Sequence, residues 1–349
     1  MSRRAARAMP SASVAPIEHG LHELTDNVVC VPLPLPMPDL QVVNAYVIHC
    51  PDGVTLVDPG WAYPPAETAL LKALDRLGFA VGDVRRIVAT HQHWDHYSLG
   101  VQWRDRYGIE LMLGHEEHHS ITAFARQPDE VHPGQVEMLI RAGAPQVATE
   151  IKALDWQEYE RNVAFSPPDR WLTDGEVIDC GSVRMMVRTT PGHTRGHVVL
   201  HDARQGLIFT GDHLLPRITP SIAFERAPEH LPLRSYINSL RLMLDLPDAR
   251  MLPAHGATER TTHARAHELI EHHETRLNRI SELVAAGACT AYDVANQMLW
   301  TRRDLGLDDL PPVHRMTAIL EVQSHLDVLE LHGTLRSSDD AGVRSFAAA

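Results

Sequence analysis

The stretch that most constrains this chain runs from Thr90 to His96 and reads THQHWDH, which places three histidines and one carboxylate just after a predicted strand. Neutral imidazole and carboxylate are the ligands that borderline divalent ions such as zinc prefer, and close spacing gathers them at little loop-closure cost. Four donors so close in sequence cannot all reach one tetrahedral ion without strain. The spacing therefore predicts two neighbouring ions, the first held by His91 and His93 and the second by Asp95 and His96.

The composition narrows the class of protein. A chain of 349 residues that is 44% hydrophobic can bury a proper core in one large domain with an appendage, or in two modest domains. A formal net charge of -13 argues against a surface for nucleic acid or for an anionic membrane. Residues 1–20 are predicted to be disordered, and no apolar run is long enough to span a bilayer.

The cysteines carry no C-x-x-C spacing, so they predict neither a disulfide framework nor a thiolate zinc site. They are Cys30, Cys50, Cys180 and Cys289. This usage fits a reducing compartment, and we expect a cytoplasmic location.

The order of elements predicts an α/β fold whose chemistry lies at strand ends. β-Branched runs predict strands at 27–33, 42–48, 54–58, 86–90, 109–113, 183–190, 197–202, 207–210 and 251–253. Apolar residues at helical spacing predict helices at 64–78, 98–107 and 229–245. Four more candidate site residues lie at the ends of predicted strands, namely Asp58, His193, Asp212 and His255.

The segment from about 115 to 170 interrupts this pattern with amphipathic helices predicted at 136–142 and 146–159. We interpret it as a helical cap inserted over the site, although a solvated decoration without a substrate role would give the same pattern. The run HEEHH at 115–119 is predicted to start a helix rather than to bind metal.

Residues 259–336 predict a small C-terminal domain that resembles a winged helix. Helices are expected at 259–286, 291–300 and 313–331, followed by a short terminal hairpin or tail. Residues 337–349 are expected to be a flexible tail. Acidic residues outnumber arginines in this part, so packing or homodimer formation is a better prediction than DNA binding.

The ordered series of Asp58, the H-x-H-x-D-H run, His193, Asp212 and His255 resembles the metallo-β-lactamase superfamily. All five motifs of its hydrolytic branch are present in order. The resemblance implies a four-layer αβ/βα sandwich in the catalytic domain, residues 21–258, and two zinc ions, with iron or manganese as alternatives.

The resemblance also implies a role for each motif residue. His91, His93 and His193 would bind the first zinc, Asp95, His96 and His255 the second, and Asp212 would bridge both. Asp58 resembles the carboxylate that orients a ligand from behind, although an aspartate that only caps a turn would look the same. Arg195 replaces a frequent proline of the family, and His197 is often present without being a ligand.

A pair of divalent ions about 3.5 to 4 Å apart can share a water and lower its pKa toward about 7, so that it attacks a carbonyl without a serine or cysteine nucleophile. Asp95 would also accept a hydrogen bond from that water. The family subgroup that this chain resembles, glyoxalase-II-like or β-lactamase-like-2 hydrolases, cleaves thioesters, esters or lactones. We expect a small-molecule acyl substrate, with Arg217 as the candidate partner of a substrate carboxylate or phosphate.

Other interpretations of the same residues remain open. The chain could be a metal-dependent endoribonuclease, which would need a basic channel beside the metals. It could be a mononuclear iron dioxygenase of the persulfide type, which can keep the same H-x-H-x-D-H letters. A binding module with a degenerate site is a further alternative, although no ligand position is missing.

Overall fold

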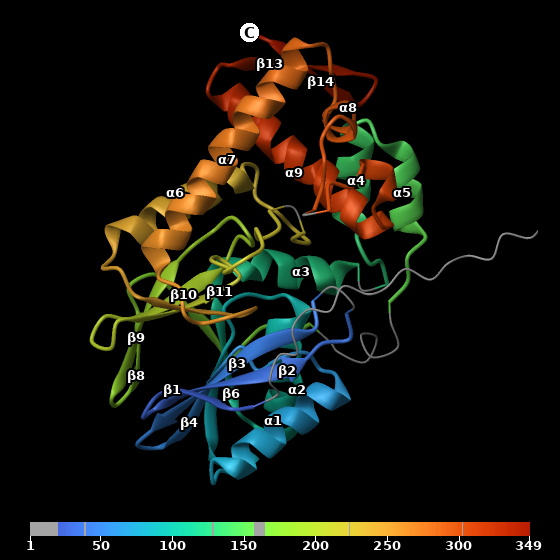
Figure 1. The fold of residues 1–349 in the computed structure, drawn as a ribbon. Helices are drawn as coiled ribbons and strands as arrows, with labels where there is room; N and C mark the ends of the chain where they lie inside the picture. Colours follow the sequence, from blue (N-terminus) through green and yellow to red (C-terminus); the bar gives the residue numbers. More distant parts are fainter. Residues whose placement is uncertain (1–19, 38–39, 128, 157–164, 223, 302) are drawn as a thin grey trace, which may run out of the picture.

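The computed structural model describes residues 20–37, 40–127, 129–156, 165–222, 224–301 and 303–349. Two β-sheets form its centre (Figure 1). The first has seven strands in chain order: β1 (His22–Thr25), β2 (Val28–Pro34), β3 (Val42–Cys50), β4 (Gly53–Val57), β5 (Val84–Val88), β6 (Glu110–Gly114) and β7 (Arg170–Leu172). The second has five in the order β12 (Arg250–Pro253), β11 (Leu207–Gly211), β10 (Val198–Asp202), β9 (Val183–Thr189) and β8 (Val177–Cys180).

The sheets pack face to face with helices on both outer faces. Along β3, Tyr46 and Ile48 belong to the core between the sheets, whereas Val43 and Val47 belong to the core beneath the first helical layer, as the period of two of a strand requires. That layer contains α1 (Pro64–Arg76) and α2 (Trp94–Tyr107), and the layer on the second sheet contains α6 (Pro232–Asp245) and α7 (Thr262–Ala285). The predicted four-layer sandwich is confirmed.

Parallel pairing brings the site residues to one edge. β4, β5 and β6 are parallel neighbours, so their carboxyl ends open toward the same side. β11 and β12 are likewise parallel and end just before Asp212 and His255. Helix α2 begins at Trp94, four residues earlier than predicted, with His93 as its N-cap. Asp95 and His96 therefore lie on its first turn.

The insertion packs against the C-terminal segment. It contains the 3-10 turn η2 (His115–Glu117), α3 (His118–Arg126), α4 (Pro133–Arg141) and α5 (Pro145–Lys152). α4 and α5 share one apolar cluster with α8 (Ala291–Asn296), α9 (Pro312–Leu331) and the last turns of α7 (Figure 1). The insertion and the C-terminal segment thus bury each other's apolar faces. The helix predicted at 146–159 ends at Lys152, and residues 157–164 lie outside the described part of the chain.

The prediction of a flexible tail at 337–349 is wrong. β13 (Leu335–Asp340) and β14 (Val343–Ala348) form an antiparallel hairpin. Phe346 is 3% exposed because it packs into the same apolar cluster, and its amide donates to the carbonyl of Cys289 at 2.7 Å. A single buried aromatic among small and charged residues is a weak strand signal in sequence.

The remaining 3-10 turns of the described residues are η1 (Val81–Asp83) and η3 (Leu307–Asp309).

Within the described residues, no helix combines the length and the apolar character that crossing a membrane requires.

Candidate metal centre

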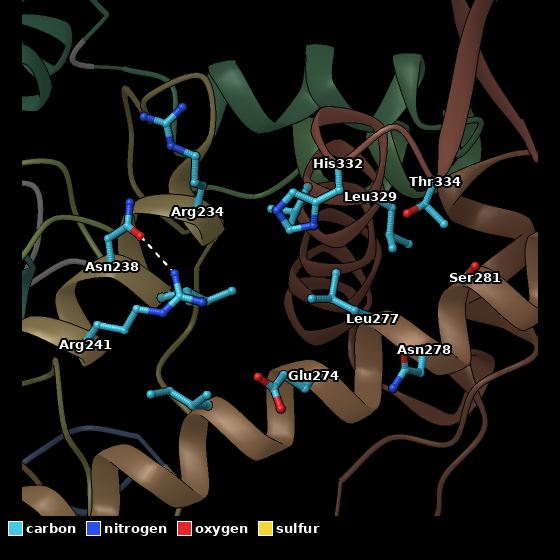
Figure 2. A pocket seen from close by; sticks show the side chains of 13 residues that line it. Arg234, Asn238, Arg241, Glu274, Leu277, Asn278, Ser281, Leu329, His332 and Thr334 are labelled. Carbon is cyan, nitrogen blue, oxygen red and sulfur yellow. Dashed lines mark hydrogen bonds between the residues drawn. The ribbon is translucent and has the colours of Figure 1, made fainter. Parts of the chain in front are cut away.

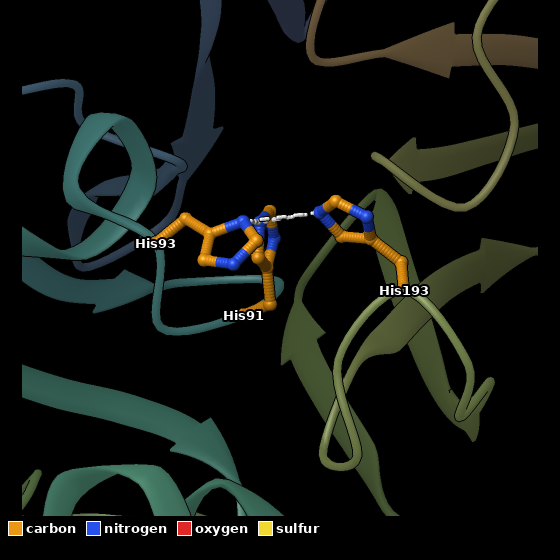
Figure 3. Close-up of side chains that lie close together, drawn as sticks. All are labelled: His91, His93 and His193. Atoms are coloured by element: carbon orange, nitrogen blue, oxygen red, sulfur yellow. Dashed lines mark hydrogen bonds between the residues drawn. The ribbon is translucent and has the colours of Figure 1, made fainter. Parts of the chain in front are cut away.

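Three imidazoles from two loops meet at the edge of the sheets. His91 and His93 lie in the loop after β5, and His193 lies in the turn between β9 and β10 (Figure 3). His193 Nε2 lies 3.3 Å from His91 Nε2 and 3.1 Å from His93 Nδ1, and the latter two nitrogens are 3.0 Å apart. We call this set the first triplet. Its three nitrogens face one point, as ligands of a single ion must.

A second set of three donors lies next to the first. His255 Nε2 is 3.2 Å from Asp95 Oδ2, and His96 Nε2 is 3.5 Å from the same oxygen. Asp95 and His96 come from the start of α2, and His255 follows β12. We call Asp95, His96 and His255 the second triplet. All three are buried and could hold a second ion.

Asp212 lies between the two triplets. Its Oδ2 is 3.6 Å from His193 Nε2, and its Oδ1 is 3.4 Å from His255 Nε2. The backbone amide of Asp212 donates to His197 Nε2 at 3.2 Å, and this hydrogen bond fixes the position of Asp212. A side chain at the preceding Gly211, which has φ 48°, would put Cβ 2.5 Å from Thr90 Oγ1, so the close approach of the two loops requires glycine. One carboxylate can therefore serve both triplets.

Backbone carbonyls fix which histidine nitrogen faces the centre. Nδ1 of His193 lies 2.7 Å from the carbonyl of Ser221, and Nδ1 of His255 lies 2.8 Å from the carbonyl of Val42. Each contact requires a proton on Nδ1, which leaves the lone pair of Nε2 available to a metal.

Asp58 supports the site from behind. It is 1% exposed and has φ 51°, which turns its carboxylate back toward the first loop. Oδ1 accepts from the amide of Thr90 at 2.7 Å, Oδ2 accepts from Thr90 Oγ1 at 2.9 Å, and Oδ2 also lies 3.1 Å from His96 Nδ1. Asp58 thus accepts two hydrogen bonds from the loop after β5 and contacts His96, which agrees with a carboxylate that orients a ligand from behind.

The electrostatics of the two triplets differ. Burial lowers the pKa of all three histidines of the first triplet. Burial alone would also lower the pKa of His96, but the carboxylates of Asp95 and Asp58 raise it well above its ordinary value. The buried atoms Nε2 of His96, Nε2 of His255 and Oδ1 of Asp212 have no hydrogen-bond partner within the described chain. Neutral imidazoles, carboxylates and such unpaired lone pairs fit divalent cations.

Glu117, which the sequence analysis did not single out, and His197, which it named only as a non-ligand, hold the loops together. Glu117 is fully buried, and its Oε1 accepts from Thr194 Oγ1, next to His193. Burial raises the pKa of Glu117 to about 8. His197 supports Asp212, because Nε2 of His197 accepts from the backbone amide of Asp212. Nδ1 of His197 lies 2.8 Å from Thr190 Oγ1. The HEEHH run gave no sign that its third residue points inward, because the run reads as wholly polar.

Aromatic rings adjoin the first triplet. The ring of Trp94, directly after His93, lies 4.4 Å from that of Phe165 and 6.3 Å from that of Phe124, and Phe224 lies 5.8 Å from His93. Phe124 and Phe165 come from the insertion. Trp94, Phe124 and Phe165 form what we call the aromatic cluster, which adjoins His93 through Trp94, the next residue in sequence. Arg217 is exposed in the loop after Asp212, and its predicted contact with substrate stays a prediction.

A cavity of about 440 Å³ lies apart from this centre, between α6, α7 and the end of α9 (Figure 2). Arg234 and Arg241 line it on one side and Glu274 on another. None of the predicted metal ligands lines it, so this cavity is separate from the candidate metal centre.

Comparisons with known proteins agree with this geometry. The chain is 26% identical over 322 residues to a probable metallo-hydrolase of Bacillus subtilis (strain 168), an alignment that covers 90% of this chain and 95% of the relative. It is 24% identical to a hydroxyacylglutathione hydrolase of Chelativorans sp. (strain BNC1), over 52% of this chain and 51% of that relative. It is 27% identical to an acyl-coenzyme A thioesterase of Bos taurus, over 49% of this chain and 56% of that relative.

Two solved structures resemble nearly the whole chain. A metallo-beta-lactamase family protein from Thermus thermophilus superposes with a TM-score of 0.77 at 26% identity and covers 93% of this chain and 100% of its own. A beta-lactamase domain protein from Burkholderia ambifaria superposes with a TM-score of 0.78 at 27% identity and covers 97% of both chains. The insertion and the C-terminal segment are thus shared with these two proteins.

The sequence model of the metallo-beta-lactamase superfamily matches residues 38–255, a span that begins just before β3 and ends at the last residue of the second triplet. The folded sandwich and the seven convergent side chains agree with this match. The chain therefore belongs to the metallo-beta-lactamase superfamily and is a hydrolase of that fold.

Proposed function

We propose that this protein is a dinuclear metal hydrolase, with zinc as the expected metal, that cleaves a thioester, ester or lactone bond of a small acyl substrate. The position of Asp212 carries the proposal, because its two oxygens face different ligand triplets. The second triplet offers donors for a second ion. One iron per chain would instead favour a persulfide-type dioxygenase, which can keep the same H-x-H-x-D-H letters.

Each residue then has a defined task. The first and second triplets would each hold one divalent cation, with Asp212 between them. When bound, the cations would supply a water of lowered pKa and would polarise the scissile carbonyl. Burial would raise the pKa of Asp95, but His96 and His255 hold it well below its usual range, so this carboxylate stays ionised and can accept a hydrogen bond from the attacking water. Asp58 keeps His96 in its ligand orientation.

The surroundings favour an apolar acyl group. The aromatic cluster adjoins His93 and offers a binding surface for hydrocarbon or an aromatic ring. The names of two relatives, an acyl-coenzyme A thioesterase and a hydroxyacylglutathione hydrolase, agree with acyl transfer to water. Each relative aligns with only about half of this chain. We therefore do not assign either leaving group, coenzyme A or glutathione, to the substrate of this protein. The net charge of -13 disfavours RNA as substrate.

The test combines metal quantification with a substrate panel. The purified protein should contain about two divalent ions per chain and should hydrolyse at least one of a series of acyl-thioesters, esters and lactones. Short RNAs in the same panel should stay intact. Metal-free protein that turned over its substrate at the full rate would contradict the proposal, as would metal-dependent cleavage of RNA alone.

A further inference from the structure

A second group of metal-binding side chains lies outside the centre described above. The sequence HEEHH at 115–119 was predicted to start a helix, and η2 and α3 confirm that prediction. The structure adds that ligand atoms of His115, Glu116 and His118 lie within 4.8 Å of one another. His119 adds a fourth donor, since its Nε2 lies 3.5 Å from Glu116 Oε2.

These side chains face solvent but are held in place. His115 Nδ1 is 2.9 Å from Glu116 Oε1, and His118 Nδ1 is 2.8 Å from the carbonyl of His115, which leaves Nε2 of His118 directed away from its own backbone. The side chains of His115 and Glu116 are 53% and 50% exposed. The donors are therefore both ordered by local hydrogen bonds and open to an ion from solution.

The backbone beneath them is fixed by the main site. Glu117 points inward between the outward-facing donors and binds Thr194. A Cβ at Gly196 would lie 2.1 Å from the Glu117 amide nitrogen, so the turn rests directly against the loop that carries His193. A fixed backbone lowers the entropy that donors lose when they bind a metal.

The spacing of His115, Glu116 and His119 also matches H-E-x-x-H, the zinc motif of metalloproteases. That motif needs a continuous helix to place both histidines on one face. Here the first three residues form a 3-10 turn, and it is His118 that groups with His115 and Glu116. The cluster therefore fits a bound ion but not protease chemistry.

We propose that His115, Glu116 and His118 form an accessory surface site for a borderline divalent cation such as zinc or nickel, separate from the catalytic centre. Two imidazoles with one carboxylate favour such ions over magnesium or calcium, which prefer oxygen ligands alone. Trp171 reports on the site, because its ring centroid lies 6.1 Å from that of His115 and 6.3 Å from that of His118.

The test measures a difference between full-length proteins, so it does not depend on how many ions the catalytic centre holds. Wild type and the double variant His115→Ala/His118→Ala are dialysed against the same buffered free zinc, and bound zinc is quantified by mass spectrometry. Wild type should retain about one equivalent more zinc than the variant. A matched control that removes two exposed histidines elsewhere, His267→Ala/His332→Ala, should bind as wild type does.

Fluorescence gives a second readout. Nickel added to the metal-free protein should quench Trp171 saturably, and His115→Ala/His118→Ala or Trp171→Phe should remove that component. The same zinc difference should persist in an Asp212→Asn background, which separates this site from the proposed function. Equal zinc content in wild type and the His115→Ala/His118→Ala variant, with unchanged thermal unfolding, would overturn the proposal, and so would equal quenching in the two proteins.

Discussion

Two buried groups of histidines in this protein have opposite surroundings. At the metal centre, Asp58, Asp95 and Asp212 lie among the imidazoles. Between α7 and α9, His273 Nδ1 lies 3.1 Å from His325 Nε2, and His325 Nδ1 lies 2.8 Å from the carbonyl of Glu321. Burial lowers the pKa of both of these histidines, that of His325 to about 3, and the nearby Arg276 lowers them further.

The difference shows what separates a ligand set from core packing. In the His273 and His325 pair, the facing nitrogens satisfy each other, and both rings stay neutral as polar members of a helix interface. At the centre, carboxylates raise the pKa of His96 and His255 although burial alone would lower it. Buried nitrogens without a hydrogen-bond partner occur in both groups, since Nε2 of His273 also has none within the described chain. Convergent carboxylates, rather than buried imidazoles alone, predict the cation site.

The largest effect that this contrast predicts is at Asp212. Asp212→Asn should lower metal content at both triplets and reduce kcat/KM by roughly three orders of magnitude or more, because it removes the charge shared between two cations. Metal analysis and initial rates measure both losses. Asp202→Asn is the matched control, since Asp202 is also a buried aspartate but accepts from the backbone amides of Arg184 and Arg204 instead of facing the two triplets. Full metal content in Asp212→Asn would contradict the inference that carboxylates distinguish the centre from the His273 and His325 pair.

A smaller effect should follow from Asp58→Asn. The variant keeps a side chain of the same shape but weakens the contact with His96 Nδ1, so metal affinity at the second triplet should fall by about 10- to 100-fold. Competition with a chelator measures this affinity. Metal affinity at the first triplet should fall less. An equal fall in metal affinity at both triplets would show that Asp58 acts on the whole loop after β5 instead of on His96.

At the helix interface, His325→Leu should destabilise the protein by about 1–3 kcal/mol, because it leaves His273 without its partner. The metal content should not change. Denaturant unfolding and metal analysis together distinguish this result from the behaviour of the centre, and loss of metal in His325→Leu would remove the distinction between the two histidine groups.

The same variant should respond less to acid. The folded-state pKa of His325, about 3, lies below its unfolded value near 6.5, so its contribution to stability is present above pH 6.5 and is lost as pH falls toward 3. His325→Leu should therefore lose less unfolding free energy between pH 7 and pH 5 than wild type, by up to about 1.4 kcal/mol per pH unit. Parallel curves for the two proteins would contradict this account.

The smallest effect is expected at Arg217. Arg217→Ala should raise KM for acidic acyl substrates with little change in kcat or metal content, because an exposed arginine contributes about 1 kcal/mol or less to an ion pair. Arg241→Ala, which removes an exposed arginine at the separate cavity, is the control. Equal KM values for neutral and acidic substrates in wild type would argue against this role.

Local patterns in the sequence predicted most strands and helices because both faces of the sheets are buried, which forces β-branched runs such as Val42–Cys50. Short elements with little apolar content were missed, among them β7 and β8, and the terminal hairpin was predicted only as an alternative to a tail. Their strands form only because a neighbouring strand or cluster covers them, as Phe346 shows.

The sequence by itself determined the chemistry, since residue types at strand ends named every member of both triplets and Asp212. The family resemblance had also divided these residues between two ions, whereas their orientation and their support were decided by tertiary structure alone. Which oxygen of Asp212 faces which triplet, that Glu117 points inward, and that α4 and α5 pack on α9 rather than only over the site all depend on contacts between segments far apart in the chain. Such contacts are set by which surfaces can bury each other, and no local pattern of residues encodes that.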